Sequence, residues 1–291
     1  MNRTLEQALL IARFDLGTAI KTKRAILGIV VYIGLALLGS VIYCSARDKI
    51  SAILDERIAE SGIDQQIQVP KNVTEKDLVK AFCETPLGAG EKAKPLGCDP
   101  DVPLVLLIFF LLITSLMPLL IAVISSDILN REIRSRAARF ILLRSSRTSF
   151  VLGKAMSHGL LFLVAAILSW AVFMTYITIN LKGFDLVANM PHVLLLIGLT
   201  LIFGFCYLGL TALISSLVDG AGVAVLVTIA ALIGLGVVGG WDFGGWLSPS
   251  WYRYRLWSPY TIVVLSGIAA YIGFGLVFFT AAWARTVRRD V

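Results

Sequence analysis

Long apolar runs separated by short polar connections make up most of the chain. Six runs are long enough to cross a membrane, at about 25–44, 102–124, 155–181, 191–217, 221–240 and 261–283, and none has Asp, Glu, Lys or Arg in its middle. An apolar run of about 18 residues or more favours a spanning helix, because such a helix bonds its own backbone groups across roughly 30 Å of hydrocarbon. The pattern predicts an all-α polytopic membrane protein with six transmembrane helices.

The residues before the first run show a different, amphipathic pattern. A helix over 4–21 would carry one apolar face, made of Leu5, Leu9, Ala12, Leu16 and Ile20. Such a helix lies in the headgroup plane among membrane lipids, and basic residues from Lys21 to Arg24 would mark its corner with the first span. Residues 1–24 are therefore predicted to form an interfacial helix; the alternative is a disordered, mildly apolar tail.

Charge agrees with a membrane protein and sets its orientation. The chain is 57% hydrophobic and only 15% charged, against roughly 25% charged in a soluble domain. The net charge of +7 could suggest nucleic acid, but the basic residues lie beside the spans, before the first, between the second and third, and in the tail 284–291. Since Lys and Arg near span ends stay cytoplasmic, both termini are predicted inside and 46–101 outside.

The connection 125–154 holds seven Arg or Lys residues. If 126–143 is helical, an apolar stripe forms on one face at about 100° per residue, made of Leu129, Ile133, Ala137 and Phe140. Asp127–Arg131 and Glu132–Arg136 are i,i+4 pairs with the acid first, the better orientation on a helix. Two interpretations stay open: a loop that obeys the positive-inside rule, or a docking surface for a cytoplasmic partner.

Three segments share their order with a known family. They are ARFDLGTAIKTKR at 12–24, SDILNREIRSRAARFILLRSSRTSFVLGK at 126–154, and WLSPSWYRYRLWSPY at 246–260 with its two Ser-Pro pairs. In this order and among these spans, they resemble the membrane-spanning permease of type-2 ABC transporters, a subunit of an ATP-binding cassette exporter. The resemblance covers nearly the whole chain in layout.

The resemblance implies a role for each segment and a set of partners. The first looks like the elbow helix, and the second like the coupling helix, which sits in a cleft of the ATPase subunit with its acid at Glu132. The coupling residues would be Asp127, Leu129, Glu132, Ile133, Arg136, Ala137, Arg139 and Phe140. Two ATPase copies would carry ATP and Mg, and a second permease would complete a homodimer or heterodimer, in a cell membrane such as a bacterial inner membrane.

The stretch 241–260 is rich in Trp and Tyr and precedes the last span. The resemblance favours re-entrant hairpins here; the alternative is a plain aromatic belt at the membrane interface. Arg253 and Arg255 would be costly deep in lipid, so the segment is expected to dip shallowly or to line a polar exit.

Enzyme chemistry finds little support in the motifs. A phosphate loop needs GxxxxGK[ST], but Gly153-Lys154 is followed by Ala155. The sequence has no HExxH and no CxxC, and His158 and His192, the only histidines, lie near span ends. We therefore expect no catalytic residue, no metal site and no cofactor in this chain, with ATP hydrolysis on a separate subunit.

The exterior segment 46–101 is too long for a simple turn, and Cys83 and Cys98 bracket a Gly- and Pro-rich stretch within it. An extracytoplasmic location permits disulfides, and closing a loop of roughly 15 residues would contribute about 3 kcal/mol. A Cys83–Cys98 bridge is predicted, although Cys44 could compete for it. The segment could also bind an extracytoplasmic partner.

Two functions from different classes remain. The first is an exporter permease that forms the path for a lipid-linked, amphipathic or peptide cargo, a preference that rests on the apolar span faces. The second is a coupling or scaffold subunit, which passes ATP-driven motion to an extracytoplasmic partner through 46–101 and moves no cargo.

Overall fold

The computed structural model describes residues 3–21, 23–60, 102–126, 128–129, 132, 140–141, 143–181, 184–240, 245–258 and 260–288. Within these ranges the chain is helical and contains no strand. The α-helices are α1 (Arg3–Lys21), α2 (Arg24–Glu60), α4 (Leu104–Ser125), α7 (Arg147–Asn180), α8 (Leu186–Leu217), α9 (Ala221–Gly239) and α10 (Thr261–Arg288), with two 3₁₀ helices, η1 (Gly245–Leu247) and η2 (Pro249–Trp257).

Six of these helices contain a stretch long and apolar enough to cross a membrane: Ile26–Ser45, Leu104–Ser125, Arg147–Asn180, Leu186–Leu217, Gly222–Gly239 and Thr261–Arg288. The prediction of an all-α polytopic membrane protein is thus confirmed. The amphipathic helix predicted before the first span is also present, as α1.

Several helices extend beyond the apolar runs. α7 begins at Arg147 rather than at 155, because Ser146 caps it and accepts a hydrogen bond from the Ser149 amide at 3.0 Å. α8 begins at Leu186 rather than at 191, because the Asp185 carboxylate accepts from two amides of the first turn. Side-chain caps satisfy the orphan amides of a helix start, so polar residues join the helix where hydropathy alone predicts a connection.

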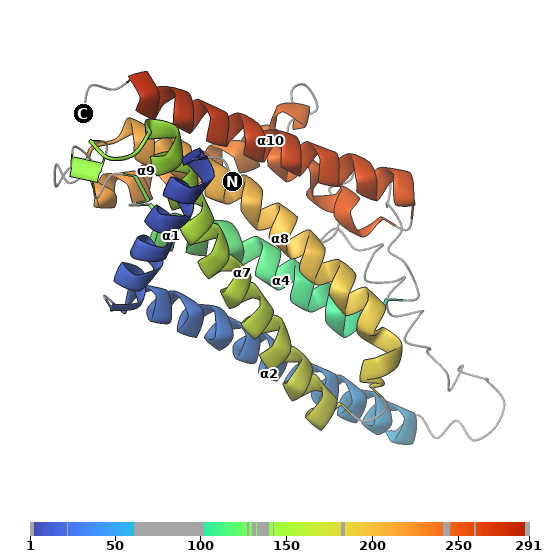
Figure 1. The fold of residues 1–291 in the computed structure, drawn as a ribbon. Helices are drawn as coiled ribbons and strands as arrows, with labels where there is room; N and C mark the ends of the chain where they lie inside the picture. The colour runs from blue at the N-terminus through green and yellow to red at the C-terminus, as the bar shows by residue number, and fades with distance from the viewer. Residues whose placement is uncertain are drawn as a thin grey trace.

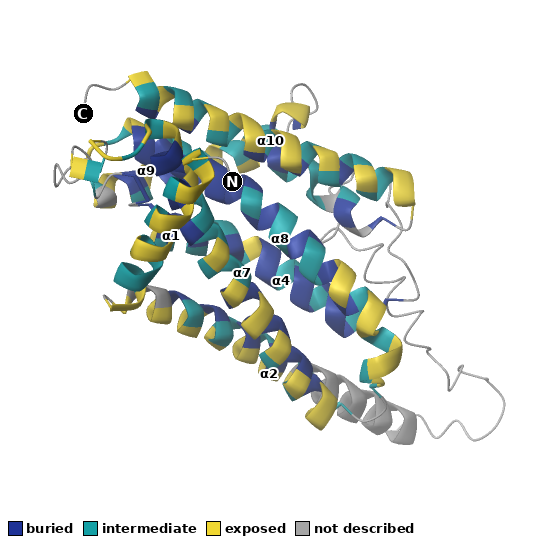
Figure 2. Cartoon of the chain, in the orientation of Figure 1, coloured by how far each residue is buried: buried dark blue, intermediate teal, exposed yellow. Residues whose placement is uncertain are grey.

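The spanning helices run side by side in a bundle, and α1 crosses one end of it (Figure 1). That end, called here the basic end, also holds Ser125 of α4, Arg147 of α7, Leu217 of α8 and the C-terminal part of α10. Burial is concentrated in α4, α7 and α8, whereas few residues of α9 and α10 are buried (Figure 2). The core centre is an aromatic group in which Phe109 stacks on Phe173 and meets Trp170 edge-on.

The segment before α10 folds back between its neighbours. The Ser248 and Ser250 hydroxyls donate to the Leu235 carbonyl of α9, at 2.6 and 3.0 Å. The Tyr252 ring lies 6.1 Å from that of Phe274, in the middle of α10. η2 therefore packs beside the central part of α10, the geometry expected of a re-entrant hairpin.

Candidate functional site

A buried lysine joins three parts of the chain at the basic end. Lys154, in the second turn of α7, is only 4% exposed. Its ammonium donates to an Asp15 carboxylate oxygen of α1 and to a Glu132 carboxylate oxygen of the segment after α4, each at 2.5 Å. We call Lys154, Asp15, Glu132, Ser157 and His158 the Lys154 junction. Because Lys154 pairs with both acids, α1 and the segment at Glu132 are held to α7 by one cation.

The other Asp15 oxygen is also engaged. The Ser157 hydroxyl, one turn after Lys154, donates to it at 2.5 Å. The His158 Nε2 lies 3.8 Å from the same oxygen, while its Nδ1 is 3.1 Å from the Ser125 hydroxyl at the end of α4. The junction thus reaches from α1 through α7 to α4.

The Asp15 carboxylate is stabilised in its charged form. Burial by itself raises the pKa of this carboxyl, but the Lys154 ammonium, the Ser157 hydrogen bond and His158 outweigh it, so that the pKa lies below its usual value of 3.8. Asp15 is therefore ionised at neutral pH. Removing one partner from such a buried pair leaves an uncompensated charge, which destabilises strongly.

Gly153 lets α1 approach α7 closely enough for these contacts. A Cβ at Gly153 would lie 2.7 Å from the Ala8 carbonyl oxygen and 2.8 Å from the Ile11 Cβ. Small residues allow helix backbones to pack directly against each other. The Gly153-Lys154 pair therefore has two linked roles: the glycine admits α1, and the lysine then reaches Asp15.

Gln7 fixes the N-terminal half of α1 to the turn before α7. Its amide nitrogen donates to the Arg144 carbonyl at 3.2 Å, and its amide oxygen accepts from the Ser146 amide at 3.3 Å and the Ser149 hydroxyl at 3.2 Å. Between Gln7 and Asp15, α1 is thus held to the start of α7 at two points.

Contacts at both ends of the 126–146 segment reach further helices. The Leu129 amide donates to the Ser215 hydroxyl of α8 at 3.1 Å. At the other end, Arg147 donates to the Val287 carbonyl and the Trp283 indole donates to the Thr148 hydroxyl, so that α7 is bonded to α10. The described residues at the two ends of this segment therefore lie next to α8 and α10.

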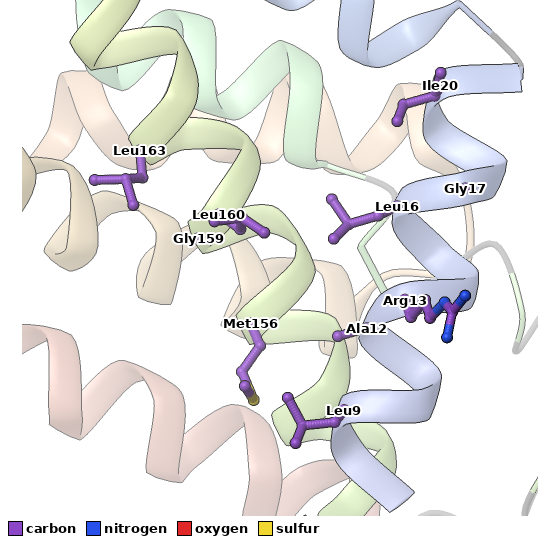
Figure 3. A pocket seen from close by; sticks show the side chains of 10 residues that line it. All are labelled: Leu9, Ala12, Arg13, Leu16, Gly17, Ile20, Met156, Gly159, Leu160 and Leu163. Carbon is purple, nitrogen blue, oxygen red and sulfur yellow. The ribbon is translucent and has the colours of Figure 1, made fainter. Parts of the chain in front are cut away.

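A groove of about 630 Å³ opens between α1 and α7. Figure 3 shows Leu9 and Leu16 of α1 on the side that faces Met156 and Leu160 of α7, while Arg13 lies at the groove's outer edge. The apolar face predicted for the N-terminal helix therefore lines its seam with α7.

The predicted coupling residues are only partly placed. Glu132 belongs to the Lys154 junction. Leu129 is 1% exposed and packs in the chain's own core, whereas Phe140 is 74% exposed. Asp127, Ile133, Arg136, Ala137 and Arg139 lie outside the described residues, as do Cys83 and Cys98, so their roles and the disulfide stay predictions.

The helix expected over 126–143 does not begin at 126, although Glu132, Phe140 and Ile141 are helical. α4 ends at Ser125, and Ile128 and Leu129 lie in a turn. Leu129 is buried because its amide donates a hydrogen bond to the Ser215 hydroxyl and its side chain packs in the hydrophobic core. Leu129 and Phe140 thus do not share one exposed stripe, and any part of Leu129 in coupling would be indirect.

Sequence reasoning missed Asp15, Lys154 and Ser157 as a cluster. Two signals were present: Asp15 is the sole acid in the basic stretch 12–24, and Lys154 and Ser157 stand three residues apart, on one face of a helix. Their meeting depends on how α1 crosses α7. Ser157 and His158 both contact Asp15, and no group of three or more metal-ligating side chains occurs in the described part of the chain.

Comparison with known proteins gives one family. The model of the family described as ABC-2 family transporter protein matches residues 9–248, which include every member of the Lys154 junction. A comparison with curated proteins finds no match.

Proposed function

The chain belongs to the ABC-2 family of transporter proteins, and from this premise we propose that it is the permease subunit of an exporter, driven by a separate ATPase that docks at the basic end. Multiple spans and family membership make it a multi-pass membrane subunit of an ABC transporter. Export, the cargo path and the mode of coupling are the proposed part.

The Lys154 junction is the observation that carries the coupling proposal. Conformational work passes between chains only through an element that is fixed to what it must move. Glu132 lies in the segment expected to meet the ATPase, and the Lys154 ammonium joins it to both α7 and α1. A push on this segment would thus turn α1 and α7 together.

A simple anchoring loop explains the basic residues but not the junction. The positive-inside rule needs Lys and Arg near the membrane surface, and it requires neither a buried cation nor its two carboxylates. Buried ion pairs are costly to desolvate and are weak evidence for stability alone. Their placement where the ATPase would dock supports a mechanical role.

The proposed assembly has two permeases and two ATPases. The basic end then faces the cytoplasm with both termini, in agreement with the distribution of Lys and Arg. Few residues of α9 and α10 are buried, and a Cβ at Gly234 or Gly236 of α9 would meet nothing within 4 Å. Such a small-residue face suits close packing of helices, so we place the second permease, in a homodimer or heterodimer, against α9.

One observation favours the scaffold alternative. α2 continues as a helix to Glu60, well past its membrane-spanning stretch Ile26–Ser45. A helix that projects from the membrane could pass motion to an extracytoplasmic partner. Transport in sealed vesicles separates the two functions, because a scaffold hydrolyses ATP with its partner but accumulates no cargo.

Substitution of exposed and junction residues tests the coupling proposal. We expect Phe140→Ala to weaken ATPase binding, because truncating a central anchor typically costs about 2 kcal/mol or more. Glu132→Arg should uncouple ATP hydrolysis from transport, because it places a second cation beside Lys154. Copurification of the ATPase and ATP hydrolysis in proteoliposomes are the measurements.

Ile262→Ala is the matched control, since Ile262 is 82% exposed but stands at the opposite end of the bundle. It should leave ATPase binding unchanged. If Phe140→Ala and Glu132→Arg both retain stoichiometric ATPase and full coupling, residues 125–154 are only a positive-inside loop, and the export proposal loses its main physical support.

Cysteine labelling on intact cells tests the orientation. A maleimide that does not cross membranes should label Ala89→Cys but not Ser145→Cys. The reverse pattern would place the basic end outside and exclude a cytoplasmic ATPase there.

A further inference from the structure

A second cation lies far from the basic end, at the middle of the bundle. Nη2 of Arg253, in η2, donates to the Leu111 carbonyl at 3.1 Å and to the Ser115 hydroxyl. Ser115 is the midpoint of α4 (Leu104–Ser125). At a rise of about 1.5 Å per residue, roughly 15 Å of helix separates it from either end.

The neighbours of Arg253 also place it halfway along the spanning helices. Tyr252 packs against Phe274, the midpoint of α10 (Thr261–Arg288). Tyr271 of the same helix is buried about one turn before Phe274. The guanidinium therefore lies near the centre of the membrane-spanning region. A shallow dip of this segment was one expectation from the sequence; the structure favours the other, a polar lining.

The hydrogen-bonding capacity of Arg253 is only partly used. Its Nε is buried and has no acceptor among the described residues, and the same holds for the hydroxyl of Tyr271, which is 0% exposed. No carboxylate lies within ion-pair distance of Arg253 in the part of the chain that the structure describes. Arg255, two residues on, differs: it donates to Ser266 at 3.2 Å and lies over the Tyr252 ring.

No carboxylate of the described residues pairs with Arg253, which leaves this cation available to an anion of another molecule. A charged side chain at the centre of a bilayer is expensive and marks a functional site by default. None of the six spans has Asp or Glu in its middle. A second copy of this chain therefore has no acidic side chain in its spans to offer at this depth.

We propose that Arg253 binds the anionic head group, a carboxylate or a phosphate, of an amphiphilic cargo that enters from the exposed face of α4. A guanidinium has five donors in a planar fork that matches carboxylate and phosphate oxygens, and the two α4 acceptors use only Nη2. Ser115 is exposed beside it, and the same face continues through exposed Leu119 and Val123, an apolar surface for the tail. This inference rests on the proposed export function and adds the cargo class.

Lipid binding to the purified permease tests the inference. The probes are lysophosphatidylglycerol and lysophosphatidylcholine of equal chain length, which differ in net charge, and native mass spectrometry measures their binding. The unsubstituted protein should prefer the anionic probe, and Arg253→Gln should reduce that preference by about tenfold or more, because hydrogen bonds to charged groups are the strong ones. Arg253→Lys, which keeps the charge, should retain part of it.

Arg255→Gln is the matched control and should keep the full preference. Inorganic phosphate at millimolar concentration should not displace the anionic probe, since it lacks the tail; displacement would assign the site to free anions and overturn the cargo class. Equal binding of the two probes by the unsubstituted protein, or an undiminished preference in Arg253→Gln, would also overturn it.

The same preparations separate this inference from the proposed function. ATPase copurification with the unsubstituted protein reports on the permease role, and Arg255→Gln should leave both this copurification and basal ATP hydrolysis unchanged. Lost ATPase binding in the unsubstituted protein would reject the export complex, whereas lost head-group preference with an intact complex would reject only the role of Arg253.

Discussion

Lys154 is a buried cation and Arg253 is a partly buried one, and their surroundings differ. Lys154 is held by two carboxylates of its own chain, from α1 and from the segment after α4. Arg253 has a backbone carbonyl and a serine hydroxyl, both from α4. The first cation is neutralised within the protomer, whereas the second has no carboxylate within ion-pair distance among the described residues.

This difference distinguishes a structural ion pair, at Lys154, from the proposed binding site at Arg253. A buried charge with its counter-ions in the same chain fixes the elements that carry them, and losing it unfolds their junction. A charge without a counter-ion contributes little to folding, and a protein retains such a group where a ligand uses it. Replacing Lys154 should therefore destabilise the fold, whereas replacing Arg253 should not.

The largest expected effect comes from Lys154→Met, which leaves Asp15 and Glu132 facing each other without a cation. Breaking a buried pair costs about 3–5 kcal/mol, so we expect a clearly lower unfolding temperature in detergent. Arg253→Met should be neutral or stabilising, because an apolar side chain replaces a charge without a carboxylate partner. Equal destabilisation by the two substitutions would break the comparison.

A rescue variant sharpens the same comparison. Asp15→Asn and Glu132→Gln, combined with Lys154→Met, remove the charges that the single substitution leaves unpaired. The triple variant should regain part of the lost unfolding temperature. If it is as unstable as Lys154→Met, lost packing rather than charge explains the effect.

A smaller effect is expected from Gly153→Ala, which tests how closely α1 must approach. The new methyl group would overlap the Ala8 carbonyl oxygen, and overpacking typically costs about 1–3 kcal/mol. Gly159→Ala is the control on the same helix, since a Cβ there meets nothing within 4 Å. It should stabilise α7 by about 0.5–1 kcal/mol. The unfolding temperatures of both variants are the measurement. Equal unfolding temperatures would show that the close contact between α1 and α7 at Gly153 does not matter for stability.

The smallest expected effect is a pH dependence of the stability that Asp15 contributes. Because its folded-state pKa lies below 3.8, the charged carboxylate stabilises the fold fully above the unfolded-state pKa, and this contribution is lost as the pH falls through the folded-state pKa. The stability difference between the unsubstituted protein and Asp15→Asn should thus be constant from about pH 7 to 5 and narrow below about pH 4. A difference that narrows already near pH 6 would contradict the lowered pKa of Asp15.

Much of the architecture follows from the sequence because the membrane imposes local rules. Each span must be long, apolar and internally hydrogen-bonded, so the number and order of the six helices are visible in the hydropathy pattern. The amphipathic spacing of Leu9, Leu16 and Ile20 likewise predicts α1 before any partner is known. The predicted helix ends were less accurate, because the starts of α7 and α8 depend on hydrogen bonds to one capping side chain each, Ser146 and Asp185.

Only the tertiary structure decided the chemistry of the two cations. Asp15 and Lys154 are 139 residues apart in sequence, and no local period relates them; they meet because Gly153 admits α1. The depth of Arg253 depends in the same way on how η2 folds back against α4 and α10. Hydropathy is the property of one segment in its solvent, whereas the pairing of a charge depends on which segments pack around it.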